Sequence, residues 1–577
     1  MTWQDTYQKW NTYEPLDKEL RKKLDEIGSS DKELEDAFYK ELTFGTGGMR
    51  GMLGPGTNRL NIYTIRKAVE GLANYLEDNV EDCYSRGVAV AYDSRYMSKE
   101  FAIETARVLG AHGIKTYVFE SLRPTPVLSF AVRYLYASAG IMITASHNPP
   151  EYNGFKVYNE DGGQLPLKEA AEVIEKVQEV GNELTVPVKS QQEVEKSDLL
   201  TWVGEKIDHA YLQQLKKISK LTATDIKKNG PLQIVFTPLH GTSHDSVLAG
   251  LKQLGFEDIH VVPEQAEPDP EFSTVTSPNP EEHQAFTIAI EQGKERNADI
   301  LIGADPDADR LGVAVKDGNG SYQVLTGNQL GTLMLDYVLS HSTENERANG
   351  RLIKTIVTTE MGRAVANHYG VETIDTLTGF KFIGEKIKQF ESTNEKFLFG
   401  YEESYGYLIG DFVRDKDAVQ AAMIACEMAS FWKKEGKTLL EAINQLYEKH
   451  GYYFEDMTSL TLKGKDGAEK IGEIMTYVRD NPFTEIGGLK VEKIEDYQIQ
   501  ERTILDSGSK EKINLPVENV VKYLLEKDSW VCLRPSGTEP KIKCYYGVSS
   551  KSRSESATLL ENLKNEMNQR INQIVES

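Results

Sequence analysis

The chain has 577 residues, of which 39% are hydrophobic and 27% are charged, as is typical of a globular protein with several cores. Its formal net charge of −23 argues against a nucleic-acid partner, because a phosphate backbone attracts basic surfaces, but does not exclude a small phosphorylated substrate. We also expect no secretory signal and no membrane-spanning segment. The 4 cysteines are scattered along the chain, so we expect neither a disulfide framework nor a zinc site. These expectations together favour a cytoplasmic protein.

The chain then shows a repeated order of elements. Residues 1–43 are polar with a helical pattern, and we expect an extension packed on the first domain. Three later segments, 87–120, 232–264 and 352–377, each run strand, polar loop, helix, glycine, strand. Each predicts a βαβ unit whose glycine caps the helix. The sequence therefore predicts three tandem α/β domains, each with a mixed sheet between helices.

The pattern changes after residue 450. The stretch 530–548 predicts two strands around a loop, and a polar helix follows. We therefore expect a fourth domain of the α+β class. The expected boundaries are 1–43 for the extension and 44–207, 208–325, 326–450 and 451–577 for the four domains.

A glycine-rich stretch, FGTGGMRGMLGPG at 44–56, opens the first domain. Glycines let the backbone approach a ligand closely, and Arg50 is suited to pairing with phosphate. It is not a Walker loop, because G-x-x-x-x-G-K-[ST] does not occur in the chain. We expect a loop here, either plain or phosphate-binding.

The stretch GIMITASHNPPEYNGFKVY, residues 140–158, predicts a buried strand that delivers a polar loop. The loop presents the hydroxyl of Ser146, the imidazole of His147 and the amide of Asn148. One interpretation is an ordinary turn, since Asn-Pro is common turn chemistry. The other is a nucleophile with neighbours that activate it.

The stretch ADILIGADPDADR ends a predicted strand with Asp305, Asp307 and Asp309. Three carboxylates so close together repel one another unless a cation lies between them, and oxygen ligands suit Mg²⁺. An EF-hand is excluded, because Arg310 and Lys316 stand where that loop needs Gly and Glu. Between an exposed acidic turn and a magnesium site, we favour the magnesium site.

The third domain offers two further loops. Lys381 lies two residues after a glycine, which predicts a hinged loop. The Lys381 ammonium is a candidate for charge stabilisation or proton transfer. The alternative is an ordinary exposed lysine. The stretch FGYEESYGYLIG presents Glu402, Glu403 and Ser404. Carboxylates are acceptors suited to sugar hydroxyls, although a solvated acidic turn has the same composition.

In the fourth domain, RPSGTEPKIK gathers hydrogen-bond donors in a short loop: Arg534, Ser536, Gly537 and Thr538. A guanidinium, two hydroxyls and free backbone N–H groups form a phosphate cradle. A surface turn with an incidental arginine is the alternative.

The order of T-A-S-H-N-P, D-P-D-A-D-R, E-E-S and R-P-S-G-T-E-P resembles that of the α-D-phosphohexomutases, most of all the members that act on glucose phosphates. The resemblance covers the whole chain. It implies four domains that each give a loop to a central cleft, and an isomerase that moves phosphate between O1 and O6 of a sugar. It also implies one Mg²⁺, a phosphoserine, glucose 1,6-bisphosphate as intermediate and activator, a small sugar phosphate as partner, and a monomer or weak homo-oligomer.

The resemblance also assigns roles to residues. It implies that Ser146 carries the phosphoryl group and holds Mg²⁺ together with Asp305, Asp307 and Asp309. Residues expected at the reacting centre are Arg50, His147, Lys156, Arg310 and Lys381. Residues expected on the sugar and its distal phosphate are Glu402, Ser404, Arg534, Ser536, Gly537 and Thr538.

Several alternatives stay open. Many relatives have histidine after E-x-S-G, where this chain has Gly406, so a mannose, pentose or amino sugar remains possible as substrate. The general base is His147, Lys381 or Asp307. A phosphatase using Asp305 as nucleophile is a rival, although Asp309 stands where that motif needs Thr or Val. A non-catalytic sugar-phosphate-binding protein is the second rival.

Overall fold

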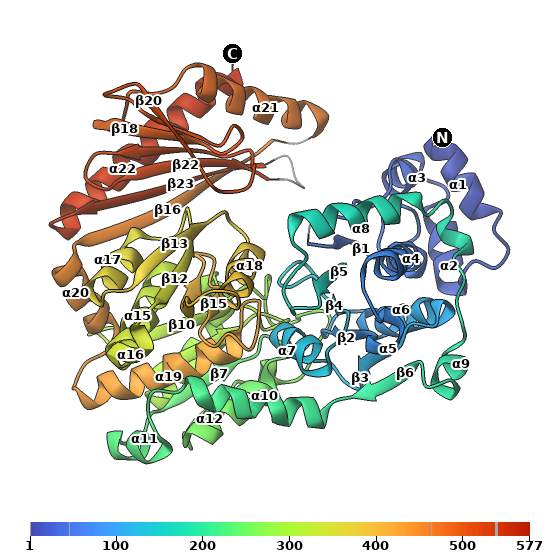
Figure 1. The fold of residues 1–577 in the computed structure, drawn as a ribbon, viewed down its shortest axis with the longest axis horizontal. Helices are drawn as coiled ribbons and strands as arrows, with labels where there is room; N and C mark the ends of the chain where they lie inside the picture. The colour runs from blue at the N-terminus through green and yellow to red at the C-terminus, as the bar shows by residue number, and fades with distance from the viewer. Residues whose placement is uncertain (1, 46, 463, 537–540, 577) are drawn as a thin grey trace. The chain divides into compact units, whose positions relative to one another are not determined.

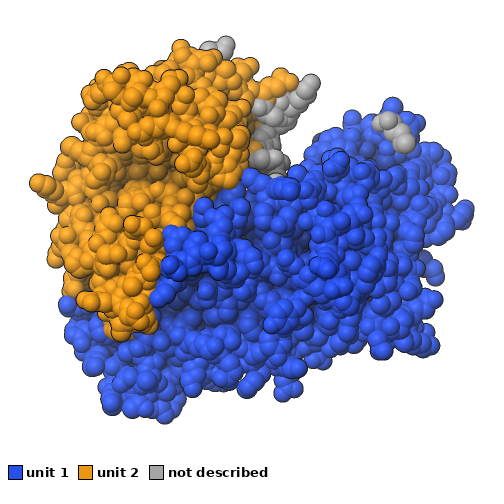
Figure 2. Space-filling model, in the orientation of Figure 1, with its two compact units in different colours: residues 1–327, 380–400, 404–438 blue, residues 328–379, 401–403, 439–577 orange. Residues whose placement is uncertain are grey.

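The computed structural model describes residues 2–45, 47–462, 464–536 and 541–576. The chain forms two compact units, each described by itself below (Figure 2). Unit 1 contains residues 1–327, 380–400 and 404–438, and unit 2 contains residues 328–379, 401–403 and 439–577.

The N-terminal extension forms three helices, α1 (Trp3–Asn11), α2 (Lys18–Ile27) and α3 (Asp31–Phe38). Their N-termini are capped by Thr2, Asp17 and Ser30, as the hydroxyl and carboxylate side chains favour. Trp10 is completely buried, and its Nε1 donates a hydrogen bond to Oε1 of Glu183 at 2.7 Å. This bond connects the extension to a residue of the segment 44–207.

The first sheet has six strands in the order β1-β5-β4-β2-β3-β6. Strands β2, β3, β4 and β6 are parallel, β5 pairs antiparallel with β4, and β1 pairs antiparallel with β5. The strands are β1 (Met49–Met52), β2 (Val88–Tyr92), β3 (Thr116–Phe119), β4 (Ala139–Ile143), β5 (Tyr152–Asn159) and β6 (Leu200–Val203). The helices are α4 (Ile62–Asn79), α5 (Cys83–Arg86), α6 (Ser98–His112), α7 (Thr125–Leu135), α8 (Leu167–Glu179) and α9 (Gln191–Lys196), with a 3₁₀ turn at Glu183–Thr185. Every residue of β2 and β4 is buried, as expected for central parallel strands.

The second sheet of unit 1 has the order β11-β10-β9-β7-β8. Its strands are β7 (Ile234–Thr237), β8 (Ile259–Val261), β9 (Ile300–Ala304), β10 (Leu311–Lys316) and β11 (Tyr322–Val324). Its helices are α10 (Glu205–Ile218), α11 (Ala223–Asn229), α12 (His244–Leu254), α13 (Pro263–Ala266) and α14 (Thr287–Arg296), with a 3₁₀ turn at His283–Phe286. Strand β9 therefore pairs with parallel β7 on one side and antiparallel β10 on the other, so the turn between β9 and β10 lies at the carboxyl end of β9.

The third βαβ unit is β12 (Gly350–Thr355), α17 (Glu360–His368) and β13 (Glu372–Thr376), with the two strands parallel. The elements that precede and follow it along the chain are α15 (Gly327–Ser340), α16 (Glu344–Arg347), α18 (Phe380–Phe390), β14 (Lys396–Tyr401), β15 (Tyr407–Leu408), α19 (Ala418–Lys434) and α20 (Leu439–His450). The predicted glycine caps are present in all three units, because Gly113, Gly255 and Gly370 have φ of 79°, 97° and 71°.

The C-terminal part of unit 2 is an antiparallel sheet with two helices packed together, α21 and α22 (Figure 1). The strand order is β16-β23-β22-β21-β18-β19-β20, with β17 paired to β18. The elements are β16 (Tyr452–Thr461), α21 (Gly464–Asp480), β17 (Glu485–Ile486), β18 (Leu489–Asp496), β19 (Glu501–Ile504), β20 (Ser509–Lys512), β21 (Val521–Leu525), β22 (Trp530–Pro535), β23 (Lys541–Ser550) and α22 (Arg553–Glu576). The predicted fold class, three α/β parts and one α+β part, is confirmed.

Candidate active site

Ser146 lies just beyond the carboxyl end of β4, in the loop that the sequence predicts. Its φ is 51°, and its backbone N–H donates to Oγ1 of Thr144 at 2.8 Å, so the chain turns sharply there. The side chain is buried, with 4% of the residue exposed. Its Oγ donates to Oδ2 of Asp305 at 2.7 Å and lies 3.2 Å from Nδ1 of His147. The strand thus aims a hydroxyl at the aspartate loop.

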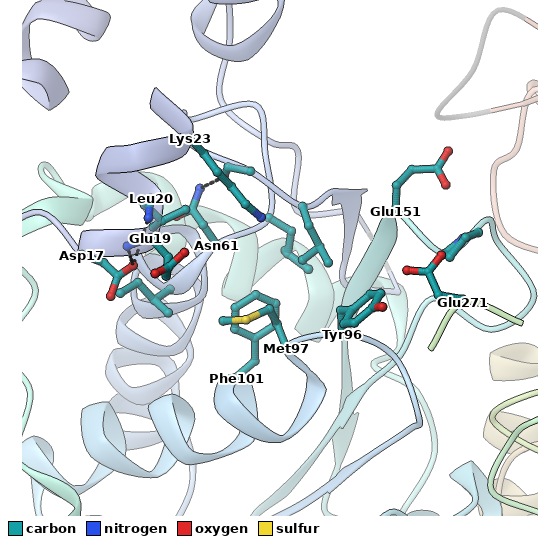
Figure 3. Close-up of a pocket in the computed structure, with 15 residues that line it drawn as sticks. Asp17, Glu19, Leu20, Lys23, Asn61, Tyr96, Met97, Phe101, Glu151 and Glu271 are labelled. Atoms are coloured by element: carbon teal, nitrogen blue, oxygen red, sulfur yellow. Dashed lines mark hydrogen bonds between the residues drawn. The ribbon is translucent and has the colours of Figure 1, made fainter. Parts of the chain in front are cut away.

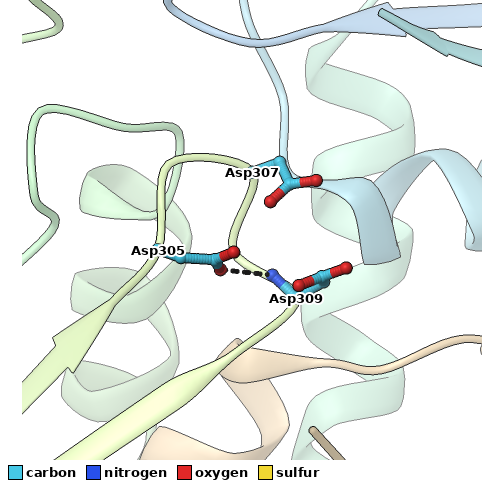
Figure 4. Close-up of side chains that lie close together, drawn as sticks. All are labelled: Asp305, Asp307 and Asp309. Atoms are coloured by element: carbon cyan, nitrogen blue, oxygen red, sulfur yellow. Dashed lines mark hydrogen bonds between the residues drawn. The ribbon is translucent and has the colours of Figure 1, made fainter. Parts of the chain in front are cut away.

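The three aspartates follow β9 and converge, and one oxygen of each lies within 4.8 Å of the others (Figure 4). All three are buried. Oδ1 of Asp305 accepts hydrogen bonds from the backbone N–H groups of Asp309 and Arg310, at 3.0 and 2.9 Å. These bonds fold the loop back onto the end of β9 and fix the direction of the carboxylates.

Two lysines balance part of this negative charge. Lys156 on β5 donates to Oδ2 of Asp307 at 2.8 Å, and Nζ of Lys416 lies 3.1 Å from Oδ2 of Asp309. Burial by itself would raise the pKa of Asp307, but Lys156, the interaction with Asp305 and then Lys416 hold it below its ordinary value. Burial, reinforced by the two neighbouring carboxylates, raises the pKa of Asp305 well above its ordinary value.

The donor set fits a hard divalent cation. Oδ1 of Asp307 and Oδ1 of Asp309 are buried and have no hydrogen-bond partner among the described residues. Buried carboxylate oxygens are costly without a partner, and three converging oxygens are ligands that Mg²⁺ prefers. Asp305, Asp307 and Asp309 are therefore the residues that would hold the ion.

Arg95 is a further residue of this site, outside the sequence motifs described above. Its guanidinium donates to the carbonyl oxygens of Ser146, Pro149 and Tyr152 at 2.7, 2.8 and 2.9 Å, and also to that of Asn148. It pairs with Asp93 at 3.4 Å, and both side chains are completely buried. The signal was available: D-S-R follows the first strand of the first repeat, at the same sheet edge where β4 ends.

Two candidates lie in a different local structure from the one predicted. Arg50 lies in strand β1, not in a plain loop, because residues 49–52 pair with β5. Its Nη1 donates to Oδ1 of Asn148 at 2.7 Å. This bond brings Arg50 to the serine loop, residues 144–151 between β4 and β5. Lys381 lies in the first turn of α18, not in a hinged loop, and its ammonium lies 5.1 Å from the centre of the Phe382 ring.

Arg310 and His147 complete the described cluster. Arg310 forms an ion pair with Glu281, and its Nε lies 3.8 Å from Oδ1 of Asp309. Burial, together with the nearby Arg310 and Arg50, lowers the pKa of His147 well below its ordinary value. The structure therefore brings together the serine, the aspartates and the cations Lys156 and Arg310, whose roles stay predictions.

The predicted sugar-binding carboxylates lie in unit 2. Glu402 is buried, and its Oε1 accepts from the backbone N–H of Gly379 at 2.8 Å. Oε2 of Glu403 lies 3.3 Å from the hydroxyl donors of Thr355 and Thr358. Ser404, half-buried, belongs to unit 1. Direct sugar contacts remain a prediction for these residues.

The predicted phosphate loop begins at the end of β22. Arg534 lies on that strand, and its buried Nε has no hydrogen-bond partner among the described residues. The backbone N–H of Ser536 donates to the carbonyl of Lys541 at 2.7 Å, so the loop closes between β22 and β23. Gly537 and Thr538 lie outside the described residues. An arginine with a donor left over is consistent with binding an anion.

Comparison with known proteins assigns most of the chain to one family. The matching family models are the phosphoglucomutase/phosphomannomutase α/β/α domains I, II and III, at residues 41–183, 209–319 and 326–450, and the C-terminal domain of the same family at residues 488–558. The phosphoglucomutase of Staphylococcus aureus (strain MSSA476) is 42% identical over 528 residues, which cover 91% of this chain and 92% of that protein. The phosphoglucomutase of Staphylococcus haemolyticus (strain JCSC1435) is 40% identical over 516 residues, covering 89% and 92%.

Solved structures show the same fold. A putative phosphomannomutase from Thermus thermophilus has a TM-score of 0.67 at 22% identity, covering 92% of this chain and 99% of that one. The phosphoglucomutase pp63/parafusin from Paramecium, in its open form, has a TM-score of 0.68 at 18% identity, covering 93% and 96%. The family predicted from the motif order is confirmed: the chain belongs to the phosphoglucomutase/phosphomannomutase family.

Proposed function

We propose that this enzyme is an isomerase that interconverts glucose 1-phosphate and glucose 6-phosphate through a phosphoserine at Ser146. The observation that carries the proposal is the position of the Ser146 hydroxyl, 2.7 Å from Asp305 and beside the three converging carboxylates. The preference for glucose is supported by the phosphoglucomutases that are 42% and 40% identical over nearly the whole chain.

The proposed reaction has two phosphoryl-transfer steps. First, the bond between phosphorus and Oγ of phosphorylated Ser146 breaks, a bond to the free sugar hydroxyl forms, and the hydroxyl proton leaves to a base. The product is glucose 1,6-bisphosphate, which reorients in the site so that its other phosphate faces Ser146. Oγ of Ser146 then takes the other phosphoryl group, and the released sugar oxygen regains a proton. His147 lies within hydrogen-bond distance of this Oγ, and Lys381 and Asp307 are the other candidates for the base.

The surrounding residues have distinct proposed roles. Lys156, Arg310 and Arg50 supply positive charge to the transferring group, and Glu402 and Ser404 bind sugar hydroxyls. Arg534 and Ser536, with Gly537 and Thr538, bind the phosphate that is not transferred. Mg²⁺, held by the three aspartates and phosphorylated Ser146, would offset charge on the phosphoryl group when bound.

Glucose 1,6-bisphosphate would act as activator by phosphorylating Ser146, and the enzyme would work in the cytoplasm as a monomer or weak homo-oligomer. Among the described residues, no helix combines the length and hydropathy that a bilayer crossing requires.

Peptide-mapping mass spectrometry around Ser146, before and after excess glucose 6-phosphate, tests the proposal. We expect one phosphoryl group on this peptide, drained by the sugar phosphate. A phosphoryl group that glucose 6-phosphate leaves in place would contradict the glucose assignment and direct the search to mannose, pentose or amino-sugar phosphates. A peptide that stays unmodified even after incubation with glucose 1,6-bisphosphate would contradict the phosphoserine mechanism.

A further inference from the structure

Unit 1 contains a cavity of about 550 Å³, here called the α2 cavity, that none of the proposed active-site residues lines in the described part of the chain (Figure 3). Its walls come from helix α2, the segment 53–62, the turn before α6, the end of the serine loop, and Glu271. Sites for small molecules in proteins typically enclose about 300–1,000 Å³, so this cavity is large enough for a ligand of that class.

The floor of the cavity is apolar. Leu60 and Phe101 are completely buried, while Met97 and Tyr96 keep 38% and 46% of their surface exposed. In Figure 3, Met97 lies over Phe101, with Tyr96 beside them. Large apolar side chains left open to solvent around a cavity indicate a binding surface, because their burial under a ligand is favourable.

The rim of the cavity is acidic. Its charged residues, among those the structure describes, are Asp17, Glu19, Glu151 and Glu271, against the cation Lys23. The carboxylate of Asp17 caps helix α2, and the interaction with Glu271 raises the pKa of Tyr96. Excess negative charge around an apolar cavity attracts cations and repels phosphate esters. The cavity is thus unsuited to a second sugar phosphate.

We propose that this cavity binds a small organic cation with an apolar body, such as an arylalkylamine, and that its occupancy changes the serine loop. The apolar body would contact Met97 and Phe101, and the ammonium would face Glu151 and Glu271. The effect on turnover rests on the proposed function, whereas the binding and the loop change do not.

The coupling to the serine loop follows from shared backbone. The carbonyl of Glu151 accepts from the N–H of Leu53 at 2.8 Å, and the carbonyl of Tyr96 accepts from Nδ2 of Asn153 at 2.9 Å. Tyr96 directly follows Arg95, whose guanidinium holds the carbonyls of the serine loop. Met97 has φ of 65°, in the left-handed region that non-glycine residues adopt uncommonly. A ligand against Tyr96 therefore acts on the serine loop through Arg95, and a ligand against Glu151 acts on the carboxyl end of that loop directly.

Calorimetric titration of the full chain with three probes of one shape tests the binding: 2-phenylethylamine, 2-phenylethanol and 3-phenylpropionate. We expect the amine to bind at least tenfold more tightly than the alcohol, and the carboxylate to bind most weakly. Equal affinities for amine and alcohol, or no binding of any probe, would overturn the proposal.

Variants locate the site. Leu20→Trp, on the half-buried wall of α2, should fill the cavity and abolish binding of the amine. The pair Glu151→Gln and Glu271→Gln should weaken amine binding about tenfold and leave the alcohol within twofold. Glu175→Gln, an exposed glutamate outside the cavity, is the matched control and should change neither. Amine binding that survives both cavity variants would place the probe elsewhere and overturn the assignment.

Amide hydrogen exchange measures the coupling without relying on catalysis. Saturating amine should change the exchange rate of a peptide covering residues 144–152 at least threefold in the parent chain and not in Leu20→Trp. An unchanged peptide in the presence of bound amine would overturn the coupling. The same amine should change kcat at least twofold. A chain that passes the binding and exchange tests but turns over no glucose phosphate contradicts the proposed function alone.

Discussion

The serine–aspartate cluster of unit 1 and the binding loops of unit 2 are held in different ways. In unit 1, ion pairs from Lys156 and Lys416 fix two buried aspartates, and the completely buried Arg95 fixes the backbone of the serine loop. In unit 2, Glu402 is held by one backbone N–H, and Arg534 has a buried donor without a partner among the described residues.

The difference matches two kinds of task. Charge that is fixed before the reaction stabilises a transition state without reorganisation, so the reacting centre gains from ion pairs that lock it. A residue that binds a ligand through hydrogen bonds needs donors or acceptors that the protein has not used. Substitutions should therefore affect turnover in unit 1 and substrate affinity in unit 2.

Ser146→Ala should have the largest effect, because it removes the group that we propose to carry phosphate in both steps. We expect kcat to fall by roughly 10⁴-fold or more, as for removal of other catalytic nucleophiles. A coupled assay for glucose 6-phosphate formation measures it, with the exposed Ser507→Ala as the control. Retained turnover in Ser146→Ala would remove the serine from the mechanism and revive the aspartyl-phosphate alternative.

Asp307→Asn should lower kcat by roughly 10³-fold with a small change in KM, because a fixed charge at the transferring group is lost while substrate contacts remain. Chelation of divalent metal should abolish turnover in the parent enzyme, and added Mg²⁺ should restore it. The exposed Asp258→Asn serves as the control. Full activity in chelated buffer would contradict the magnesium assignment.

Arg95→Ala tests whether a buried ion pair fixes the serine loop. It leaves Asp93 buried without its cation, so the free energy of unfolding should fall by about 3–5 kcal/mol. Denaturant unfolding measures this loss. The freed loop should also lower kcat more than it raises KM at a temperature where the variant is folded. A loss of stability with unchanged kcat would assign Arg95 a structural role only.

Glu455 allows a test of electrostatics in unit 2 through the pH dependence of the free energy of unfolding. Burial raises the pKa of this carboxyl to about 7, and its oxygens face Thr359 and Asn328, with Glu360 and Lys354 nearby. The folded state thus binds a proton that the unfolded state releases near pH 4.5. Stability should therefore fall by up to about 3 kcal/mol as pH rises from about 4.5 to about 7.

Glu455→Gln should flatten this part of the pH profile of unfolding, whereas Glu492→Gln, an exposed glutamate on β18, should leave it unchanged. Denaturation at several pH values gives the slope. A slope in Glu455→Gln equal to that of the parent chain would assign the proton to another group.

Arg534→Lys should have the smallest effect of the five. An ammonium keeps the charge but loses the planar fork that binds phosphate through two bonds, so KM should rise about tenfold with kcat within a factor of about two. Arg296→Lys, exposed on α14, is the control. A loss confined to kcat would instead connect Arg534 to the transferring phosphate and weaken the contrast between the two units.

Much of the fold was predictable from local pattern. The repeated strand–loop–helix–glycine order predicts the βαβ units around 87–120, 232–264 and 352–377, because period and capping chemistry are encoded in neighbouring residues. The same holds for the serine loop, where an apolar strand stops at polar residues and prolines. Spacing also predicts the aspartate cluster, since alternate carboxylates after one strand have only a short loop in which to converge.

Other features depend on contacts between distant segments. The assignment of Arg50 to strand β1 depends on pairing with β5, about a hundred residues later, and glycine-rich composition conceals that strand. The role of Arg95 depends on β2 and β4 being neighbours, which carries its guanidinium to the carbonyls of a loop fifty residues away. The α2 cavity depends on α2 packing beside the turn before α6. Most elements, and the chemical groups at their ends, could therefore be predicted from the chain alone, because both are local properties. Which groups meet depends on the folded arrangement, because ion pairs, cavities and an edge strand such as β1 form between segments whose separation in the chain carries no signal of contact.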